Sequence, residues 1–391
     1  MLMLIPVSYN LRNLTVRKVT TAATAVGIGL VVFVFASVLM LSNGITRMMG
    51  TTGRADNAIV ISKGSGAELS STIEKERVGL ILDKPEVAHD QKGAPLGVAE
   101  LVVVLTMDKL GTNGISNVTV RGVDPNTLAF RPEVKIISGR AAKPGTDEVI
   151  VGTKVAGRFK GLKLGQTFEV RKNRPANVVG IFSADNSAYE SEVWGDIDTF
   201  RAAFGRPGIS SSMRVRLAAA SKFDAFKHAI EDDKALGLEV QREDAYYEKQ
   251  SEGLSTFING LGITIAIFFS LGAMIGAMIT MYGSIAMRRR EIGTLRALGF
   301  SRGGILFSFL LESTALALLG GVVGVLASLA MGTVSFSMVN FATWSEIIFK
   351  FEPTPKIIAV SFVFAAFMGI LGGFFPALRA AYTSPIQAMR N

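Results

Sequence analysis

Four long apolar runs constrain this chain more than any other feature of its sequence. Each has at least 18 mostly apolar or small residues and no more than one charge, which is the pattern of a helix that crosses a membrane. They cover residues 20–41, 254–287, 305–331 and 357–378. About 210 residues separate the first two runs, enough for a compact unit with its own core. We therefore predict a membrane protein with four transmembrane helices and a large α+β domain inserted between helices 1 and 2.

The composition agrees with this division. The 391 residues are 49% hydrophobic with a mean hydropathy of +0.38, too apolar for a soluble protein and too polar for one built of membrane helices alone. The first run is longer than the apolar segment of a signal peptide, so we interpret it as an uncleaved anchor. The second run would be about 50 Å long as a helix, against about 30 Å for the hydrocarbon core. It should therefore protrude as a stalk.

Arginine and lysine near the ends of the runs predict the orientation. The N-terminal segment, the loop 288–303 and the C-terminal tail each carry at least two of these residues, and four spans place all three segments on one side. Because basic residues favour the cytoplasmic side, both termini and this loop should be cytoplasmic. The protein should then be a multi-pass protein of the bacterial cytoplasmic (inner) membrane.

The predicted order along the chain follows directly. It is a cytoplasmic amphipathic segment (1–19), helix 1 (20–42), an extracytoplasmic α+β domain (43–253), a stalk with helix 2 (254–287), a cytoplasmic coupling hairpin (288–303), helix 3 (304–332), an extracytoplasmic loop (333–356), helix 4 (357–378) and a cytoplasmic tail (379–391).

The net charge of +9 does not indicate a nucleic-acid partner. Residues 43–254 hold 29 Lys and Arg against 28 Asp and Glu, so nearly all of the excess lies in the cytoplasmic segments. We interpret it as a topology signal and a contact for anionic membrane lipids. No nucleic-acid-binding motif is present.

Within the large domain, β-branched runs predict strands at 57–62, 100–107, 117–123 and 212–218. Helices are expected at 69–82, 197–203 and 222–232, the last capped by Ser221 and burying Phe223, Phe226 and Ile230. A strand-rich insertion should occupy about 110–190. The polar segment 244–253 leads into the second apolar run without proline, so the stalk helix can begin before the membrane and carry its movement into the domain.

No residue pattern supports catalysis or a bound cofactor. His89 and His228 are far apart and lack a metal-ligand spacing, and the chain has no cysteine. Neither a nucleophile motif nor a GxxxxGK[ST] phosphate loop occurs. We predict a non-catalytic subunit, so that any ATP would be hydrolysed by a separate protein.

Glu312 is the one ionisable residue within the predicted spans. It could be a relay or a gate, but we favour a carboxylate paired with an arginine of the neighbouring hairpin, with Arg296 as the candidate partner. Small residues also recur at every fourth position in two spans. These stripes, which include Gly272 and Gly276 in the second span and Gly320 and Gly324 in the third, should let helices pack closely within or between subunits.

The segment from Arg290 to Gly299, REIGTLRALG, resembles the coupling segment of ABC transporter permeases of the MacB/FtsX/LolC type. In that family the pattern is followed by a span with a glutamate, matched here by Glu312. On a helix, Ile292, Leu295 and Leu298 fall near one face, and Gly299 can end that helix in a left-handed cap before Ser301 begins the next.

Further matches lie far from the first. The C-terminal residues Pro376, Ala377, Arg379, Ala380, Pro385, Ile386, Ala388 and Arg390 resemble the family's closing signature, with Met389 where leucine is commoner. The opening resembles the family at Asn10, Leu11, Arg12, Asn13, Gly27 and Ile28, although 15–18 depart from the usual arginine spacing. VRGVDP at 120–125 and DEVIVG at 147–152 resemble its extracytoplasmic core domain.

The resemblance implies a type VII architecture, a dimer of four-span permeases with two ATPases beneath that works by mechanotransmission. A second copy or a paralogue would complete the dimer, and ATP and Mg²⁺ would be bound by the ATPase. An apolar ridge and the arginines would contact the ATPase, through Arg289, Arg290, Glu291, Ile292, Leu295, Arg296, Leu298 and Gly299.

Two functions follow as hypotheses. In the first, the chain is a split permease subunit for export or extraction of a lipid, a lipoprotein or another hydrophobic cargo, working with a periplasmic adaptor, carrier or lipoprotein. In the alternative, it is an FtsX-like signalling subunit that regulates a cell-wall hydrolase without transport. The substrate and the choice between homodimer and heterodimer do not follow from the residues.

Overall fold

The structure, a computed structural model, describes residues 18–384. They form two compact units, which we describe separately: a helical unit (18–44, 256–334 and 350–384) and a sheet domain (45–255 and 335–349). The opening motif at Asn10–Asn13 and the C-terminal matches from Pro385 to Arg390 lie outside the described residues, as does most of the expected amphipathic segment 1–19.

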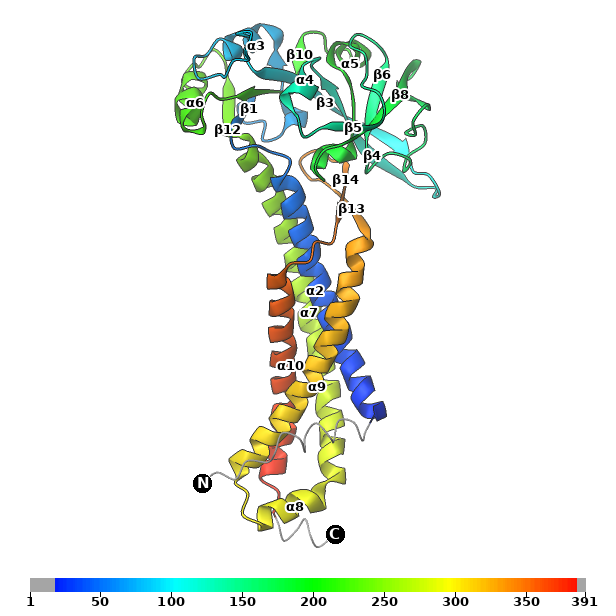
Figure 1. Cartoon of the computed structure of the whole chain (residues 1–391), viewed down its shortest axis with the longest axis vertical. Helices are drawn as coiled ribbons and strands as arrows, with labels where there is room; N and C mark the ends of the chain where they lie inside the picture. The colour runs from blue at the N-terminus through cyan, green and yellow to red at the C-terminus, as the bar shows by residue number, and fades with distance from the viewer. Residues whose placement is uncertain (1–17, 385–391) are drawn as a thin grey trace. The chain divides into compact units, whose positions relative to one another are not determined.

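Four helices of the described chain are long and apolar enough to cross a membrane (Figure 1). They are α2 (Lys18–Gly50), α7 (Glu243–Met287), α9 (Arg302–Ala330, extended by the 3-10 turn η4, Met331–Thr333) and α10 (Pro355–Ala381). One short helix, α8 (Arg289–Ala297), lies between α7 and α9. The four predicted spans are confirmed as helices, and α2 and α7 each continue beyond the apolar run into the sheet domain.

Local sequence signals set several of these helix ends. The Ser301 hydroxyl accepts a hydrogen bond from the Gly304 backbone N–H and begins α9. Thr354 caps α10 in the same way through the N–H of Ile357. Gly299, with φ of +94°, follows α8 in the left-handed region that favours glycine. The expected roles of Gly299 and Ser301 are confirmed.

The sheet domain is built on one ten-stranded sheet. Its order is β12-β1-β11-β3-β4-β9-β6-β8-β5, with β7 paired to β8. Most pairs are antiparallel, but β4 with β9 and β6 with β8 are parallel. The strands are β1 (Asn57–Ser62), β3 (Gly97–Asp108), β4 (Ile115–Val123), β5 (Lys135–Gly139), β6 (Glu148–Gly152), β7 (Thr167–Arg171), β8 (Arg174–Ser183), β9 (Glu192–Asp196), β11 (Ser212–Arg216) and β12 (Leu238–Arg242).

Short helices cover this sheet and close two hydrophobic cores. They are α3 (Lys75–Leu82), α4 (Thr127–Phe130), α5 (Ile197–Phe204) and α6 (Phe223–Glu231). Helix α6 buries Phe223, Phe226 and Ile230, as expected, in the core over β1, β11 and β12. The second core lies over β3, β4, β6 and β9 and includes residues of α5. The predicted α+β domain between the first two spans is therefore present.

Two local expectations for this domain are wrong. The helix expected at 69–82 begins only at Lys75. Before it, residues 68–74 form the 3-10 turn η1 (Glu68–Ser70) and the short strand β2 (Ile73–Glu74), which pairs with β10 (Ile209–Ser210). The hydroxyls of Ser71 and Ser62 accept hydrogen bonds from backbone N–H groups in this region, which favours the turn over a helix. Ser221 does not cap α6; it lies inside the 3-10 turn η3 (Ala220–Lys222). The region 110–190 is rich in strands, as expected: it holds β4 to β8, which belong to the ten-stranded sheet.

The expected loop 333–356 contains a β-hairpin. Strands β13 (Ser335–Val339) and β14 (Glu346–Lys350) pair with each other. Ile348 of β14 joins the second core of the sheet domain, and Glu346 forms ion pairs with Lys109 (2.6 Å) and Arg158 (3.2 Å). The hairpin is therefore part of the sheet domain.

Candidate coupling site and groove

Helix α8 has one buried and one exposed face. Ile292 is 2% exposed and packs in a cluster drawn from α7, α8, α9 and α10, which also holds Met281, Ile285, Ile305, Phe309, Ala377, Ala380 and Ala381. Arg289, Arg290 and Glu291 in the same helix are exposed, and Leu298 just beyond the helix is 68% exposed. The helix is thus fixed to the bundle by an apolar anchor and presents a charged surface.

This arrangement corrects the expectation for Ile292. The sequence placed it with Leu295 and Leu298 on a ridge that a partner would receive, but its side chain is inside the bundle. Leu295 is half-buried and Leu298 is exposed, so these two remain on the accessible side of the segment.

A buried ion pair ties the start of α8 to α9. The Arg288 guanidinium donates from Nη1 to Glu312 Oε2 over 2.9 Å, and the two side chains are each 7% exposed. The same guanidinium lies over the ring of Phe309, 5.2 Å from its centroid, and Nε contacts Glu291 Oε2 at 3.3 Å. Arg288 therefore holds together the end of α7, the first turn of α8 and the interior of α9.

The expected partner of Glu312 was the wrong arginine. Arg296 donates from Nη1 to the carbonyl oxygen of Phe300 (2.8 Å) and so closes the end of α8 instead. In the sequence, Arg288 is the first of three consecutive arginines, and nothing distinguishes it from the other two. The turn between α7 and α8 directs it inward while Arg289 and Arg290 point outward. The sequence of such a run does not predict which of its arginines points into the protein.

A small cavity with both polar and apolar lining lies beside this ion pair. It has a volume of about 160 Å³ and is lined by Glu312 and by hydroxyl groups of α2 and α7, from Thr20, Thr21, Thr24, Thr280 and Ser284. A cavity of this size has room for several water molecules, and the hydroxyl groups could bind them. Hydration there would reduce the penalty of holding two charges in an apolar bundle.

The two glycine stripes have different environments. In α9, a Cβ added to Gly320 would lie 2.6 Å from the carbonyl oxygen of Ala25, and one added to Gly324 would lie 2.4 Å from that of Gly29. These contacts show that α2 and α9 approach backbone to backbone, which only glycine permits. The third-span stripe is therefore used inside this chain.

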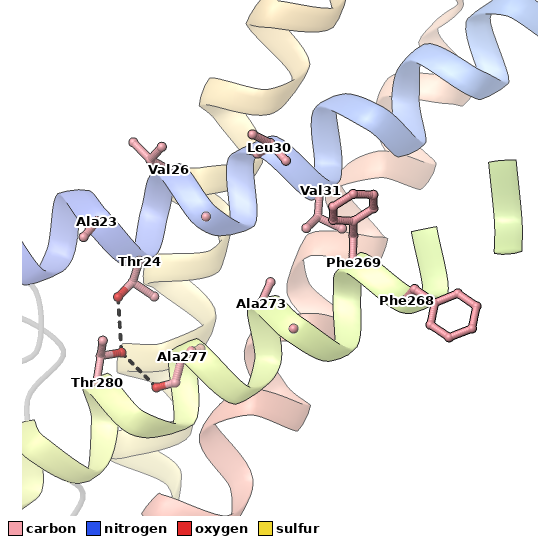
Figure 2. A pocket seen from close by; sticks show the side chains of 13 residues that line it. Ala23, Thr24, Val26, Leu30, Val31, Phe268, Phe269, Ala273, Ala277 and Thr280 are labelled. Atoms are coloured by element: carbon pink, nitrogen blue, oxygen red, sulfur yellow. Dashed lines mark hydrogen bonds between the residues drawn. The ribbon is translucent and has the colours of Figure 1, made fainter. Parts of the chain in front are cut away.

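The stripe in α7 is open. A Cβ added to Gly272 or Gly276 would meet no atom within 4 Å. Both glycines line a groove of about 460 Å³ between α2 and α7, with Phe268 and Phe269 toward one end and a hydrogen bond between the Thr24 and Thr280 hydroxyls (3.2 Å) at the other (Figure 2). The rest of its lining is apolar, from Ala23, Val26, Gly27, Leu30, Val31, Ala273 and Ala277.

The sheet domain offers no arrangement typical of a catalytic centre. Over residues 18–384, no group of three or more His, Cys, Asp or Glu side chains could hold a metal ion. His228 is exposed and 3.6 Å from Asp232, and His89 is also exposed. The charged residues that stand out there are instead arginines and glutamates buried in the interior.

Comparison with known proteins gives the family. Residues 21–233, more than half of the chain, match the family described as MacB-like periplasmic core domain, and residues 263–385 match the FtsX-like permease C-terminal family. The first match covers α2 and most of the sheet domain. The second covers most of α7, all of α8, α9 and α10, both glycine stripes and the hairpin β13–β14.

Three individual proteins are similar to parts of this chain. The uncharacterized ABC transporter permease YknZ of Bacillus subtilis is 26% identical over 293 residues, which is 70% of each chain. The macrolide export ATP-binding/permease protein MacB of Pectobacterium atrosepticum is 28% identical over 230 residues, 56% of this chain but only 34% of MacB. The crystal structure of the periplasmic region of MacB from Actinobacillus actinomycetemcomitans covers 51% of this chain and 94% of its own, with 12% identity and a TM-score of 0.38. The chain is a multi-pass membrane protein and belongs to the MacB/FtsX family of ABC transporter permeases.

Proposed function

We propose that this chain is the permease subunit of a split ABC transporter, in which a separate ATPase subunit moves the sheet domain through the helices. The observation that carries the proposal is the two-faced helix α8. Its buried Ile292 and the Arg288–Glu312 pair fix it to α9 and the bundle. A protein that pushed on its exposed face would therefore move whole helices and not a loose loop.

The exposed side of α8 suits an ATPase with an acidic rim beside an apolar depression. Arg289 and Arg290 supply the charges and Leu298 supplies the apolar contact. ATP and Mg²⁺ would be held by the ATPase, and this chain would bind no cofactor. The arginines also favour a cytoplasmic location for α8, with both termini on that side of the cytoplasmic membrane.

The cargo we propose is a lipid, a lipoprotein or another hydrophobic molecule that is exported or extracted. A periplasmic adaptor, carrier or lipoprotein would then work with the sheet domain. The second function, regulation of a cell-wall hydrolase, uses the same coupling and differs in what the sheet domain contacts.

The groove between α2 and α7 supports a dimeric assembly. Gly272 and Gly276 lie uncovered in its lining, whereas the matching stripe of α9 is filled by α2. Small residues of this kind allow a helix of a second subunit to come close. We propose that a second copy or a paralogue covers this groove, and membrane lipid would fill it in a monomer.

The test is co-purification and activity with the ATPase encoded nearest to this chain. Glu291→Lys and Leu298→Asp should each reduce ATPase binding and stimulation, and Lys356→Glu, an exposed charge at the start of α10, serves as the control. Unchanged binding and stimulation in both α8 variants would exclude α8 as the coupling site. Stimulation of the ATPase by lipid or lipoprotein would favour export, and stimulation only by a bound hydrolase would favour signalling.

A further inference from the structure

A network of seven charged side chains lies inside the sheet domain. As whole residues, none is more than 7% exposed, and they come from seven different segments that include four strands and α7. They are Glu68, Glu100, Arg121, Arg131, Glu192, Arg214 and Glu243. Charged residues are almost never buried to this extent unless they are paired. No local sequence pattern predicts the network, because its members are spread over about 180 residues.

Glu243, the first residue of α7, is the member that reaches the helix. Its Oε1 accepts hydrogen bonds from Arg214 Nε (2.8 Å) and Arg131 Nη1 (3.3 Å), and the Tyr189 hydroxyl lies 3.4 Å away. These three donors belong to β11, the end of α4 and the turn before β9. One carboxylate oxygen thus connects α7 to distant parts of the sheet domain.

The other oxygen of Glu243 reaches the segment that follows α2. Oε2 accepts from Asn57 Nδ2 (2.8 Å) and from the backbone N–H of Arg54 (3.3 Å). A Cβ added to Gly53 would lie 2.5 Å from the Glu243 carbonyl oxygen, so the two chain segments touch backbone to backbone here. Glu243 therefore joins the end of one long helix, the start of another and the sheet.

Two tyrosines on the same face of α7 strengthen the attachment. The Tyr247 hydroxyl accepts from Arg214 Nη2 (2.9 Å) and shares a hydrogen bond with the Tyr189 hydroxyl (2.9 Å). The Tyr246 hydroxyl accepts from the backbone N–H of Glu68 (3.1 Å). Positions i, i+3 and i+4 share one face of a helix. The first two turns of α7 are thus held by three side chains at once.

The remaining charges keep this attachment rigid. Arg121 contacts Glu100 (2.7 Å), Glu192 (2.7 Å) and Glu68 (2.9 Å), and Arg131 donates from Nη2 to Glu100 (2.8 Å). Burial by itself would raise the pKa of Glu100, but the nearby guanidinium groups lower it to about 2, so the carboxylate stays ionised. Planar guanidinium groups accept little change in angle.

Well-packed apolar residues can be as stable as buried ion pairs, so stability alone does not explain why this site is charged. If α7 contacted the sheet only through apolar side chains, the helix could rotate about its axis with little loss of interaction energy. Here any rotation would leave several buried charges without partners. The helix itself continues unbroken to Met287, with no proline along its 45 residues.

We propose that Glu243, together with Tyr246 and Tyr247, is a positioning residue that locks the rotation of α7 to the sheet domain. The domain then turns with the helix and does not swivel at the junction. This inference rests on the proposed function, in which movement of the helices reaches the sheet domain. It names the side chains that transmit that movement.

The test measures one distance in the full chain, assembled with its ATPase in lipid nanodiscs without ATP. The natural sequence has no cysteine, so Asp224→Cys on α6 and Glu252→Cys on α7 introduce two exposed sites for spin labels. Labelled chains are diluted into unlabelled ones so that only distances within one chain are recorded. The intact network should give a single narrow distance distribution.

Glu243→Gln should cause loss of that narrow distribution, because a neutral amide cannot satisfy the two arginines. The matched control is Asp244→Asn, the next acid in the same turn, which lies outside the network and should leave the distribution narrow. Tyr247→Phe removes one hydroxyl and keeps the packing; it should broaden the distribution less, and it decides the question if Glu243→Gln does not fold. Retained Trp194 fluorescence, recorded with Trp344→Phe, shows that each labelled variant is folded.

An unchanged narrow distribution in folded Glu243→Gln and Tyr247→Phe chains would overturn the inference. A role in stability alone would lower the unfolding temperature and leave the distance unchanged. If the proposed function is wrong, the result is different. The distance distribution of the natural sequence would still be narrow, but adding ATP would change neither the position of the sheet domain nor any coupled activity. ATPase turnover that persists in Glu243→Gln while coupled activity is lost would support the inference further.

Discussion

The helical unit and the sheet domain both bury opposite charges, but in different numbers. In the helical unit, Arg288 and Glu312 form one pair beside a small cavity. In the sheet domain, seven charges share partners, and Arg214 alone contacts three carboxylates. A single pair fixes one point between two helices, whereas a shared network fixes the orientation of a whole helix. Removing charges one at a time tests this difference.

Arg214→Met should have the largest effect. It leaves Glu68, Glu100 and Glu243 without their common cation in a fully buried site, at a cost on the order of 5 kcal/mol, the upper end for a broken buried pair. Thermal unfolding of the full chain in nanodiscs measures it. The prediction fails if Arg214→Met is no less stable than Arg77→Met, whose guanidinium is partly exposed.

Glu312→Leu should destabilise the helical unit by about 4 kcal/mol, because it leaves Arg288 buried without its main counter-charge. Arg288→Met combined with Glu312→Leu should recover most of the loss, since the pair is then removed as a whole. Detergent-induced unfolding of the three variants measures this. A double variant as unstable as the single one would show that the pair does not act as a unit.

Acid should weaken the sheet domain before the helical unit. The pKa of Glu100 is about 2 in the folded chain against an ordinary value of 4.5, so its ionised form stabilises the fold above pH 4.5, and this contribution is lost as the pH falls toward 2. The loss amounts to roughly 3 kcal/mol. Fluorescence of Trp194, recorded with Trp344→Phe, follows the domain. The pH dependence should shrink in Glu100→Gln; an identical profile would contradict the assignment.

The two glycine stripes should respond differently to the same substitution. Gly324→Leu forces side-chain atoms into the backbone of α2 and should cost about 1–3 kcal/mol or more. Gly276→Leu has open space around it, so the stability of the monomer should hold while association of subunits weakens. Unfolding and cross-linking measurements separate the two effects. Equal loss of stability in both variants would mean that the groove is closed within the chain.

Leu298→Asp should have the smallest effect on stability, within about 0.5 kcal/mol, because the side chain is 68% exposed. Its effect should appear in ATPase binding. A large drop in stability would place Leu298 inside the fold and remove it from the docking surface.

The sequence predicts the helices and strands of this protein better than it predicts which residues they contact. The four spans, the burial of Phe223 and the cap at Gly299 follow from local patterns, and the structure agrees. Ile292 was assigned to the wrong side of α8, because an amphipathic pattern identifies an apolar face but not what that face contacts. Arg288 and Glu243 depend on neighbours 24 and up to 189 positions away, which no local pattern encodes.

The hairpin β13–β14 has a consequence for the order of biosynthesis. Ile348 completes a core whose other members lie between Ala99 and Phe200, yet it is made only after the third membrane helix. The core over β3, β4, β6 and β9 therefore gains its last buried residue only after α9 has been synthesised, long after the strands that form the rest of this core have left the ribosome.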